Sequence, residues 1–158
     1  MAAALTLRVY TGTDAGTESG AQTGIDLVSV DSATNSAPNR AANEVVPATN
    51  SFEKWLRLRV DTAPVGAATN FWLQSDDSLP DGVTIKFGVT DTPATPTAST
   101  STVATTTLEV GRRYIFDANS YSDVGDHTRY LVLQEQVAAD AASGSIDQLV
   151  PSIGWQET

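Results

Sequence analysis

Apolar and polar residues alternate along several short stretches of this chain. The clearest case is 83–89, where Val, Ile, Phe and Val alternate with Thr, Lys and Gly. The stretches 5–10 and 56–61 show the same alternation. Because successive side chains of a strand point to opposite faces, each stretch predicts a strand with one buried face.

Further stretches combine β-branched and aromatic residues with turn signals at their ends. The strongest turn signal is Pro80-Asp81-Gly82, directly before the strand at 83–89. We expect additional strands at 24–30, 69–74, 102–110, 112–116, 128–137 and 146–153. Only 137–143 favours a helix, which Gly144 would end.

Many short strands at regular spacing are typical of an all-β domain. The sequence predicts a single-domain antiparallel β-sandwich spanning 1–158, jelly-roll or immunoglobulin-like, with long loops or arms. The segments 11–23, 31–50 and 90–101 are polar and have no apolar period, so we expect them to be those loops or arms. The predicted core consists of Leu56, Leu58, Val60, Val83, Ile85, Phe87, Leu131 and Leu133.

The charge balance disfavours several kinds of partner. Nine Lys and Arg residues face nineteen Asp and Glu residues, which gives a net charge of −10. Such a surface repels phosphate groups, so we expect no direct binding to nucleic acid or to an anionic membrane. The N-terminal residues lack a basic and an apolar signal region, and we expect synthesis in a cytoplasm without a recognisable export signal.

The residues that usually carry catalysis are scarce. The chain has no cysteine and a single histidine, His127, which lies in a predicted turn. No Gly-x-Ser-x-Gly elbow and no phosphate-binding glycine motif occurs. The sequence from Asp117 onward begins like a calcium-binding loop. Three positions at which such a loop requires other residues are occupied by Tyr121, Ser122 and Thr128. We therefore predict no catalytic residue, no cofactor and no metal site.

Aromatic and arginine residues in the predicted strands are candidates for contact with a partner. Trp55 lies on the opposite strand face from Leu56, and Phe71 and Trp72 are adjacent, so one of those two points away from the core unless both faces are covered. Protein interfaces are enriched in such residues, although a core position is the alternative for each tryptophan. The interface candidates are Trp55, Arg57, Arg59, Phe71, Trp72 and Trp155.

Three stretches between 51 and 110 follow one another in a recognisable order. They are Ser-Phe-Glu-Lys-Trp at 51–55, Asn-Phe-Trp at 70–72 and Gly-Val-Thr-Ile-Lys-Phe-Gly at 82–88, and a Thr/Pro/Ser-rich stretch follows at 90–101. This order resembles that of small virion structural proteins of tailed bacteriophages. The resemblance implies a non-enzymatic protein located in the virion, with the major capsid protein or another virion protein as partner and assembly as a homo-oligomer on the particle.

Within that family, the acidic charge favours the outer surface of the head over a DNA-lined lumen. A capsid decoration or cement protein is therefore the first interpretation. Three alternatives remain open at this point. They are a tail, neck or fibre component of the same particle, a carbohydrate-binding β-sandwich that uses Trp72 or Trp55, and a hydrolase that uses His127.

Overall fold

The computed structural model describes residues 3–76, 78–141 and 152–158. Its strands are β1 (Ala4–Thr11), β2 (Thr17–Glu18), β3 (Lys54–Thr62), β4 (Ala68–Gln74), β5 (Val83–Thr90), β6 (Thr106–Thr107), β7 (Arg113–Asp117), β8 (Tyr130–Val137) and β9 (Ser152–Glu157). A short 3-10 turn, η1, spans Thr13–Ala15, and one α-helix, α1, spans Ala37–Ala42. No helix in the described ranges is long and apolar enough to cross a membrane.

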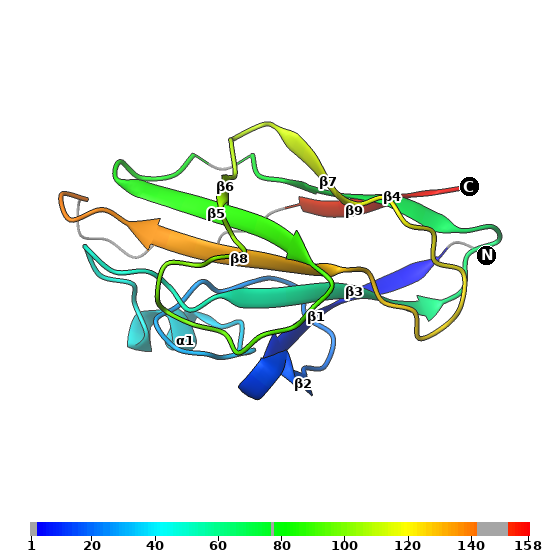
Figure 1. Ribbon diagram of the computed structural model, residues 1–158, viewed down its shortest axis with the longest axis horizontal. Helices are drawn as coiled ribbons and strands as arrows, with labels where there is room; N and C mark the ends of the chain where they lie inside the picture. The colour runs from blue at the N-terminus through cyan, green and yellow to red at the C-terminus, as the bar shows by residue number, and fades with distance from the viewer. Residues whose placement is uncertain (1–2, 77, 142–151) are drawn as a thin grey trace.

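The strands form two antiparallel sheets. The larger sheet has the order β2-β1-β3-β8-β5-β6, and the smaller has the order β7-β4-β9. In Figure 1 the long strands β5, β8 and β3 run side by side across the molecule, with the smaller sheet packed against them. This arrangement confirms the predicted all-β sandwich.

The main core lies between the two sheets. The large sheet contributes side chains from β1, β3, β5 and β8, and the small sheet contributes Ala68, Phe71, Leu73 and Phe116. All eight residues of the predicted core are buried. The alternation of apolar residues was a reliable guide because one face of each long strand packs against the opposite sheet.

The opposite face of the large sheet has a second, smaller core. Tyr10, Trp55, Tyr130 and Val132 pack there with Ala104 from the 90–105 segment. That segment crosses the sheet directly over Gly88, where an added Cβ would lie 1.8 Å from the carbonyl oxygen of Val103. The long polar loop therefore covers apolar side chains of the same domain.

A buried amide fixes this loop to the sheet. Gln134 in β8 is fully buried, and its Oε1 accepts the backbone N–H of Ser101 at 2.9 Å. Its Nε2 donates to the carbonyl oxygens of Ser99 at 2.8 Å and Ser51 at 3.1 Å. Since a buried amide without partners is costly, these bonds hold the loop in one position.

Three secondary-structure predictions are wrong. The segment 24–30 is irregular although Ile25 and Val28 are buried, because its apolar side chains close the end of the core without pairing as a strand. Of 102–110, only Thr106–Thr107 forms a strand. Residues 138–141 form a turn where a helix was expected, and 142–143 lie outside the described residues. Most of the predicted strand 146–153 also lies outside them, and β9 begins at Ser152.

The segment 31–50 packs on the domain through specific contacts. Ser36 caps α1 by accepting the backbone N–H of Asn39, and Arg40 forms a 2.8 Å ion pair with the buried carboxylate of Asp26. No helical period is visible in this part of the sequence, because α1 is a single short segment that is stabilised by its cap and by this ion pair. The segments 11–23 and 90–101 are likewise loops held to the large sheet, apart from η1 and β2.

The core can be tested with Phe87→Ala. The ring is 7% exposed and its centroid lies 4.7 Å from that of Tyr114 across the two sheets. Its removal should lower the free energy of unfolding by about 3–5 kcal/mol, measured by urea denaturation. Thr84→Ala, at an exposed position of the same strand, should cost no more than about 0.5 kcal/mol. Equal losses for the two variants would contradict this packing.

Candidate interaction surface

Two of the six interface candidates belong to the interior. Trp55 is 1% exposed and donates its indole N–H to Glu53 at 3.0 Å. Phe71 is fully buried and its ring meets those of Phe116 and Tyr121. As a correction to the sequence analysis, both are core residues: Trp55 because the loop over the large sheet covers it, and Phe71 because it faces the space between the sheets.

Trp72 points away from the core because strand β4 contains a bulge. Ala68 and Phe71 are both buried, although regular alternation would place residues three apart on opposite faces. The pairing of β4 with its neighbours shifts here, and Asn70 has a φ of 50°. Asparagine tolerates this left-handed conformation better than most residues. The bulge therefore turns Phe71 inward and Trp72 outward.

The indole of Trp72 is held between the two neighbouring strands. On the β9 side it lies over Gly154, where an added Cβ would come within 2.2 Å of the ring. On the β7 side the guanidinium of Arg113 lies 4.1 Å from the ring centroid. Ile115 pairs directly with Trp72 and its side chain is 55% exposed. Together, Trp72, Arg113 and Ile115 form what we call the outer patch of the small sheet.

Among the residues that the structure describes, the outward positions next to the outer patch carry no acidic side chain, and Asp76 is bound by Gln74. The neighbouring outward positions carry Asn70, whose amide donates to Gln156 at 2.7 Å, together with Gln74 and Ser152. Asp117, at the end of β7, is buried under Tyr121. On a chain with a net charge of −10, this patch combines an exposed aliphatic residue, an aromatic ring and a cation, which is the composition of protein-binding surfaces.

Arg57 and Arg59 lie on the other outer surface, that of the large sheet. The guanidinium of Arg57 donates to the carbonyl oxygens of Thr128 and His127 and lies 4.7 Å from the ring centroid of Tyr130. This side chain therefore anchors the chain before β8. Arg59 belongs to a network of ion pairs with separations of 3.4 to 4.0 Å; its members are Arg8, Glu18, Arg59 and Asp61. His127 adjoins the network at Glu18 and forms an ion pair there only when its imidazole is protonated.

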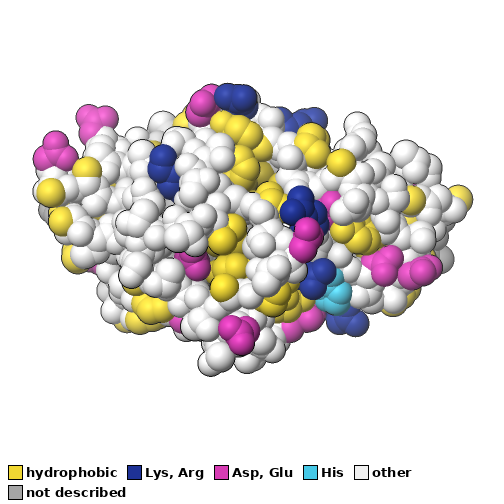
Figure 2. Space-filling model, in the orientation of Figure 1, with side chains coloured by type: hydrophobic (Ala, Val, Ile, Leu, Met, Phe, Trp, Pro, Cys, Tyr) yellow, Lys and Arg dark blue, Asp and Glu magenta, His cyan; other side chains and the backbone are white. Residues whose placement is uncertain are grey.

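Figure 2 shows the chain's histidine beside blue and magenta side chains on this surface. His127 Nε2 lies 3.4 Å from Glu18, and burial, followed by the positive charge of Arg57, lowers the pKa of His127. Within the described residues, no serine or threonine hydroxyl forms a hydrogen bond with this imidazole. The network ties β2 to β1 and β3 and does not resemble a nucleophile–base pair.

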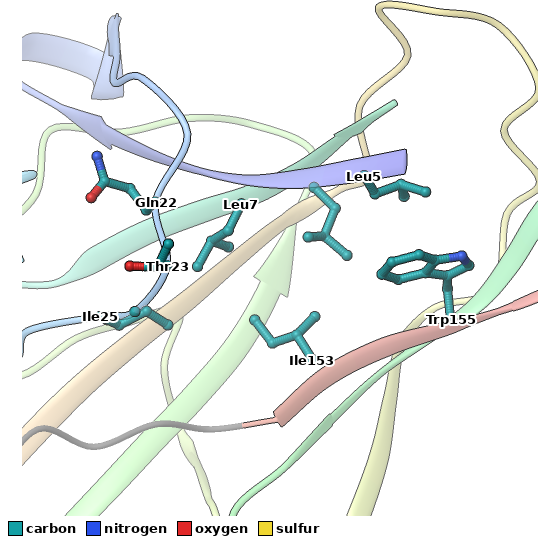
Figure 3. A pocket seen from close by; sticks show the side chains of 9 residues that line it. Leu5, Leu7, Gln22, Thr23, Ile25, Ile153 and Trp155 are labelled. Atoms are coloured by element: carbon teal, nitrogen blue, oxygen red, sulfur yellow. The ribbon is translucent and has the colours of Figure 1, made fainter. Parts of the chain in front are cut away.

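Trp155 lines a pocket of about 230 Å³ between β1 and β9 (Figure 3). Leu5 and Leu7 from β1 point toward Ile153 and Trp155 from β9, and Ile25 closes one side. All of these side chains also pack against the main core. The pocket is the open edge of the sandwich, and within the described residues it contains no charged side chain.

Two charged residues are buried on the inner face of the large sheet. Burial lowers the pKa of Lys54 to about 8, although Asp31 and Asp26 act against this, and its ammonium donates to the carbonyl oxygen of Ser32. Burial also raises the pKa of Glu135 to about 7. These residues lie under the 24–45 segment, where Leu27, Val28 and Arg40 surround a small cavity next to Glu135.

The suggested calcium loop is occupied by internal hydrogen bonds. Asp117 Oδ2 accepts the hydroxyl of Tyr121 and the backbone N–H of Arg129, both at 2.8 Å, and Oδ1 accepts the N–H of Asn119 at 2.9 Å. These donors order the turn before β8. Among the residues that the structure describes, no group of three or more acidic or histidine side chains is arranged to hold a metal ion.

The fold and these surfaces define an all-β sandwich with polar loops and an exposed outer patch on its smaller sheet. Comparison with known protein families, curated proteins and solved structures finds no match for this chain.

Sequence reasoning identified Trp72 but missed Arg113, Ile115 and the bulge at Asn70. The alternation in 112–116 does place Arg113 and Ile115 on one strand face, which was an available signal. Nothing in the sequence showed that this face lies beside Trp72, since the pairing of β4 with β7 joins segments about forty residues apart.

The buried carboxyl group of Glu135 makes a pH-dependent prediction. Its pKa rises from 4.5 in the unfolded chain to about 7, so the folded state binds more protons between these values and stability falls as the pH rises through them. Glu135→Gln removes this effect. Between pH 4 and pH 8, the free energy of unfolding of the variant should rise by on the order of 3 kcal/mol relative to that of the wild type. Urea unfolding at each pH measures this difference.

Glu44→Gln is the matched control, because Glu44 is exposed and lines the same small cavity. It should not reproduce the pH-dependent gain. A constant difference between Glu135→Gln and the wild type across this range would show that Glu135 is not responsible.

Proposed function

We propose that this protein is a non-enzymatic structural protein of a virion, a capsid decoration or cement protein that binds the outer surface of a phage head and stabilises it. The observation that carries the proposal is the outer patch of the small sheet. It presents the half-buried Trp72 and the exposed Arg113 and Ile115, and in the described part of the chain Arg113 forms no ion pair, although the domain is acidic. The resemblance of 51–110 to small phage virion proteins supports the choice of particle.

The design of the domain suits attachment to a preformed shell. The acidic surface keeps free copies soluble and apart, while the outer patch supplies apolar contact at one place. Many copies bound to a symmetric shell strengthen weak individual contacts through avidity. The loops that were candidate arms are held to the domain by Gln134 and by the Asp26–Arg40 ion pair, so we assign the contact to the sheet surface.

A tail, neck or fibre component of the same particle would use the same surface, and particle imaging distinguishes the locations. A carbohydrate-binding module is less well supported. Sugar rings stack on an open aromatic face, whereas the guanidinium of Arg113 covers the ring of Trp72.

Docking through the outer patch can be tested with Ile115→Glu. Placing a carboxylate in an apolar contact should reduce the amount of protein on purified particles by about tenfold or more, measured by quantitative immunoblotting. Val124→Glu is the control, because Val124 is 63% exposed and lies on a loop outside the small sheet. Particles without the protein should lose DNA at a lower temperature than complete ones. Equal occupancy for both variants, or equal heat resistance, would contradict the proposal.

The non-enzymatic role gives a second test. His127→Ala should leave particle occupancy within about twofold of the wild type, because the imidazole contacts Glu18 on the large sheet, away from the outer patch. The purified protein should show no His127-dependent turnover of ester or glycoside substrates. An activity that disappears with His127→Ala would favour the hydrolase alternative.

A further inference from the structure

Arg113 differs from the other arginines of the described chain in its partners. Five arginines pair with carboxylates, namely Arg8, Arg40, Arg59, Arg112 and Arg129. Arg57 donates to two backbone carbonyl oxygens. Within the described ranges, the guanidinium of Arg113 contacts the ring of Trp72 and makes one long hydrogen bond, from Nε to Gln74 Oε1 at 3.5 Å. It forms no ion pair there.

Contact with Trp72 restricts this guanidinium, whose central carbon lies 4.1 Å from the centroid of the ring. Gly154 holds the ring in place from the β9 side, because any Cβ there would meet the indole. A guanidinium stacked on an aromatic face keeps its N–H groups in the plane of the stack, where they remain available to a carboxylate. Less side-chain freedom is then lost when a ligand binds, so Arg113 is preorganised for recognition.

Asp76 is the acidic side chain closest to Arg113 along the hydrogen bonds of this surface, but it does not bind Arg113 directly. Asp76 accepts the amide of Gln74 at 2.7 Å, and Gln74 in turn accepts from Arg113. The directly neighbouring outward position on the same strand is Ile115, which is exposed. A ligand that satisfies this patch therefore needs one carboxylate and one apolar group a few ångströms away.

We propose that Arg113, held by Trp72, binds an aspartate or glutamate side chain of the partner protein, while an apolar neighbour of that residue packs on Ile115. This inference rests on the proposed docking role of the outer patch and specifies the chemistry of the partner. A charged hydrogen-bonded pair of this kind is among the strongest polar contacts at interfaces. A second copy of this chain is the less suitable occupant, because each copy has a net charge of −10.

The test uses the isotope-labelled full-length chain and two capped peptides, Ac-Leu-Glu-Leu-NH2 and Ac-Leu-Gln-Leu-NH2, which differ only in the carboxylate. Binding is followed through the NMR signals of the Arg113 Nε–H and the Trp72 indole N–H. The variants are Arg113→Ala, Arg113→Lys and Arg112→Ala. The last is a matched control, since Arg112 is the adjacent arginine but is paired with Glu109 at 3.0 Å.

The glutamate peptide should bind about tenfold or more tightly than the glutamine peptide. Arg113→Ala should abolish the difference, and Arg113→Lys should restore little of it because lysine presents no planar pair of donors. Arg112→Ala should leave it unchanged. Equal affinities for the two peptides, or a preference that survives Arg113→Ala, would overturn the inference.

Two other occupants are outcomes of the same experiment, and each would overturn it. Cellohexaose shifting the Trp72 signal more strongly in Arg113→Ala would identify a sugar-binding platform. Self-association in sedimentation that disappears with Arg113→Ala would identify a second copy as the occupant. Failure of the peptide preference leaves the Ile115→Glu particle test intact, and a failed particle test leaves the peptide preference intact, so the two proposals fail independently.

Discussion

Strand β8 must be covered on both of its faces, and much of the structure follows from how that is achieved. Its inner side chains, Leu131 and Leu133, pack against the small sheet, which is the ordinary arrangement of a sandwich. Its outer side chains, Tyr130 and Val132, are also apolar, so a second layer is needed. The 90–105 loop supplies this layer. Gln134 fixes the loop, because its amide is buried and must find its hydrogen-bond partners in the loop backbone. A long polar segment thus has a structural role without ordering on a partner.

The small sheet is in the opposite situation, because no segment of the described chain covers the outer patch. The bulge at Asn70 turns an aromatic ring outward there, and Gly154 and Arg113 both contact that ring. Burial of Trp72 and Ile115 would stabilise the fold, yet both side chains lie on the surface. Apolar side chains left on a surface in this way are found most often at functional sites. The large sheet's outer arginines, by contrast, are engaged by Glu18, Asp61 and backbone carbonyl groups. Because of this contrast, we propose the small sheet as the docking surface.

Buried charges mark the third distinctive region, at the end of the inner face covered by the 24–45 segment. Lys54 and Glu135 are desolvated there, and the Asp26–Arg40 ion pair fastens the covering segment. Desolvation disfavours the charged form of each group, which couples the stability of this end of the domain to pH. The same contacts explain why 31–50 is folded onto the domain although its composition is that of a loose arm.

The sequence by itself determined the fold class, the long strands and the core, because one buried face per strand imposes a period of two that is visible in Leu56, Leu58 and Val60 or in Ile85 and Phe87. It also showed that either Phe71 or Trp72 points away from the core unless both faces of the strand are covered. Only the tertiary structure decided which one, since the choice depends on a single left-handed residue, Asn70, and on pairing with β7 and β9. It likewise decided that Trp55 is core and that Arg113 lies over Trp72. These outcomes depend on contacts between segments far apart in the chain, and local periodicity contains no information about such contacts.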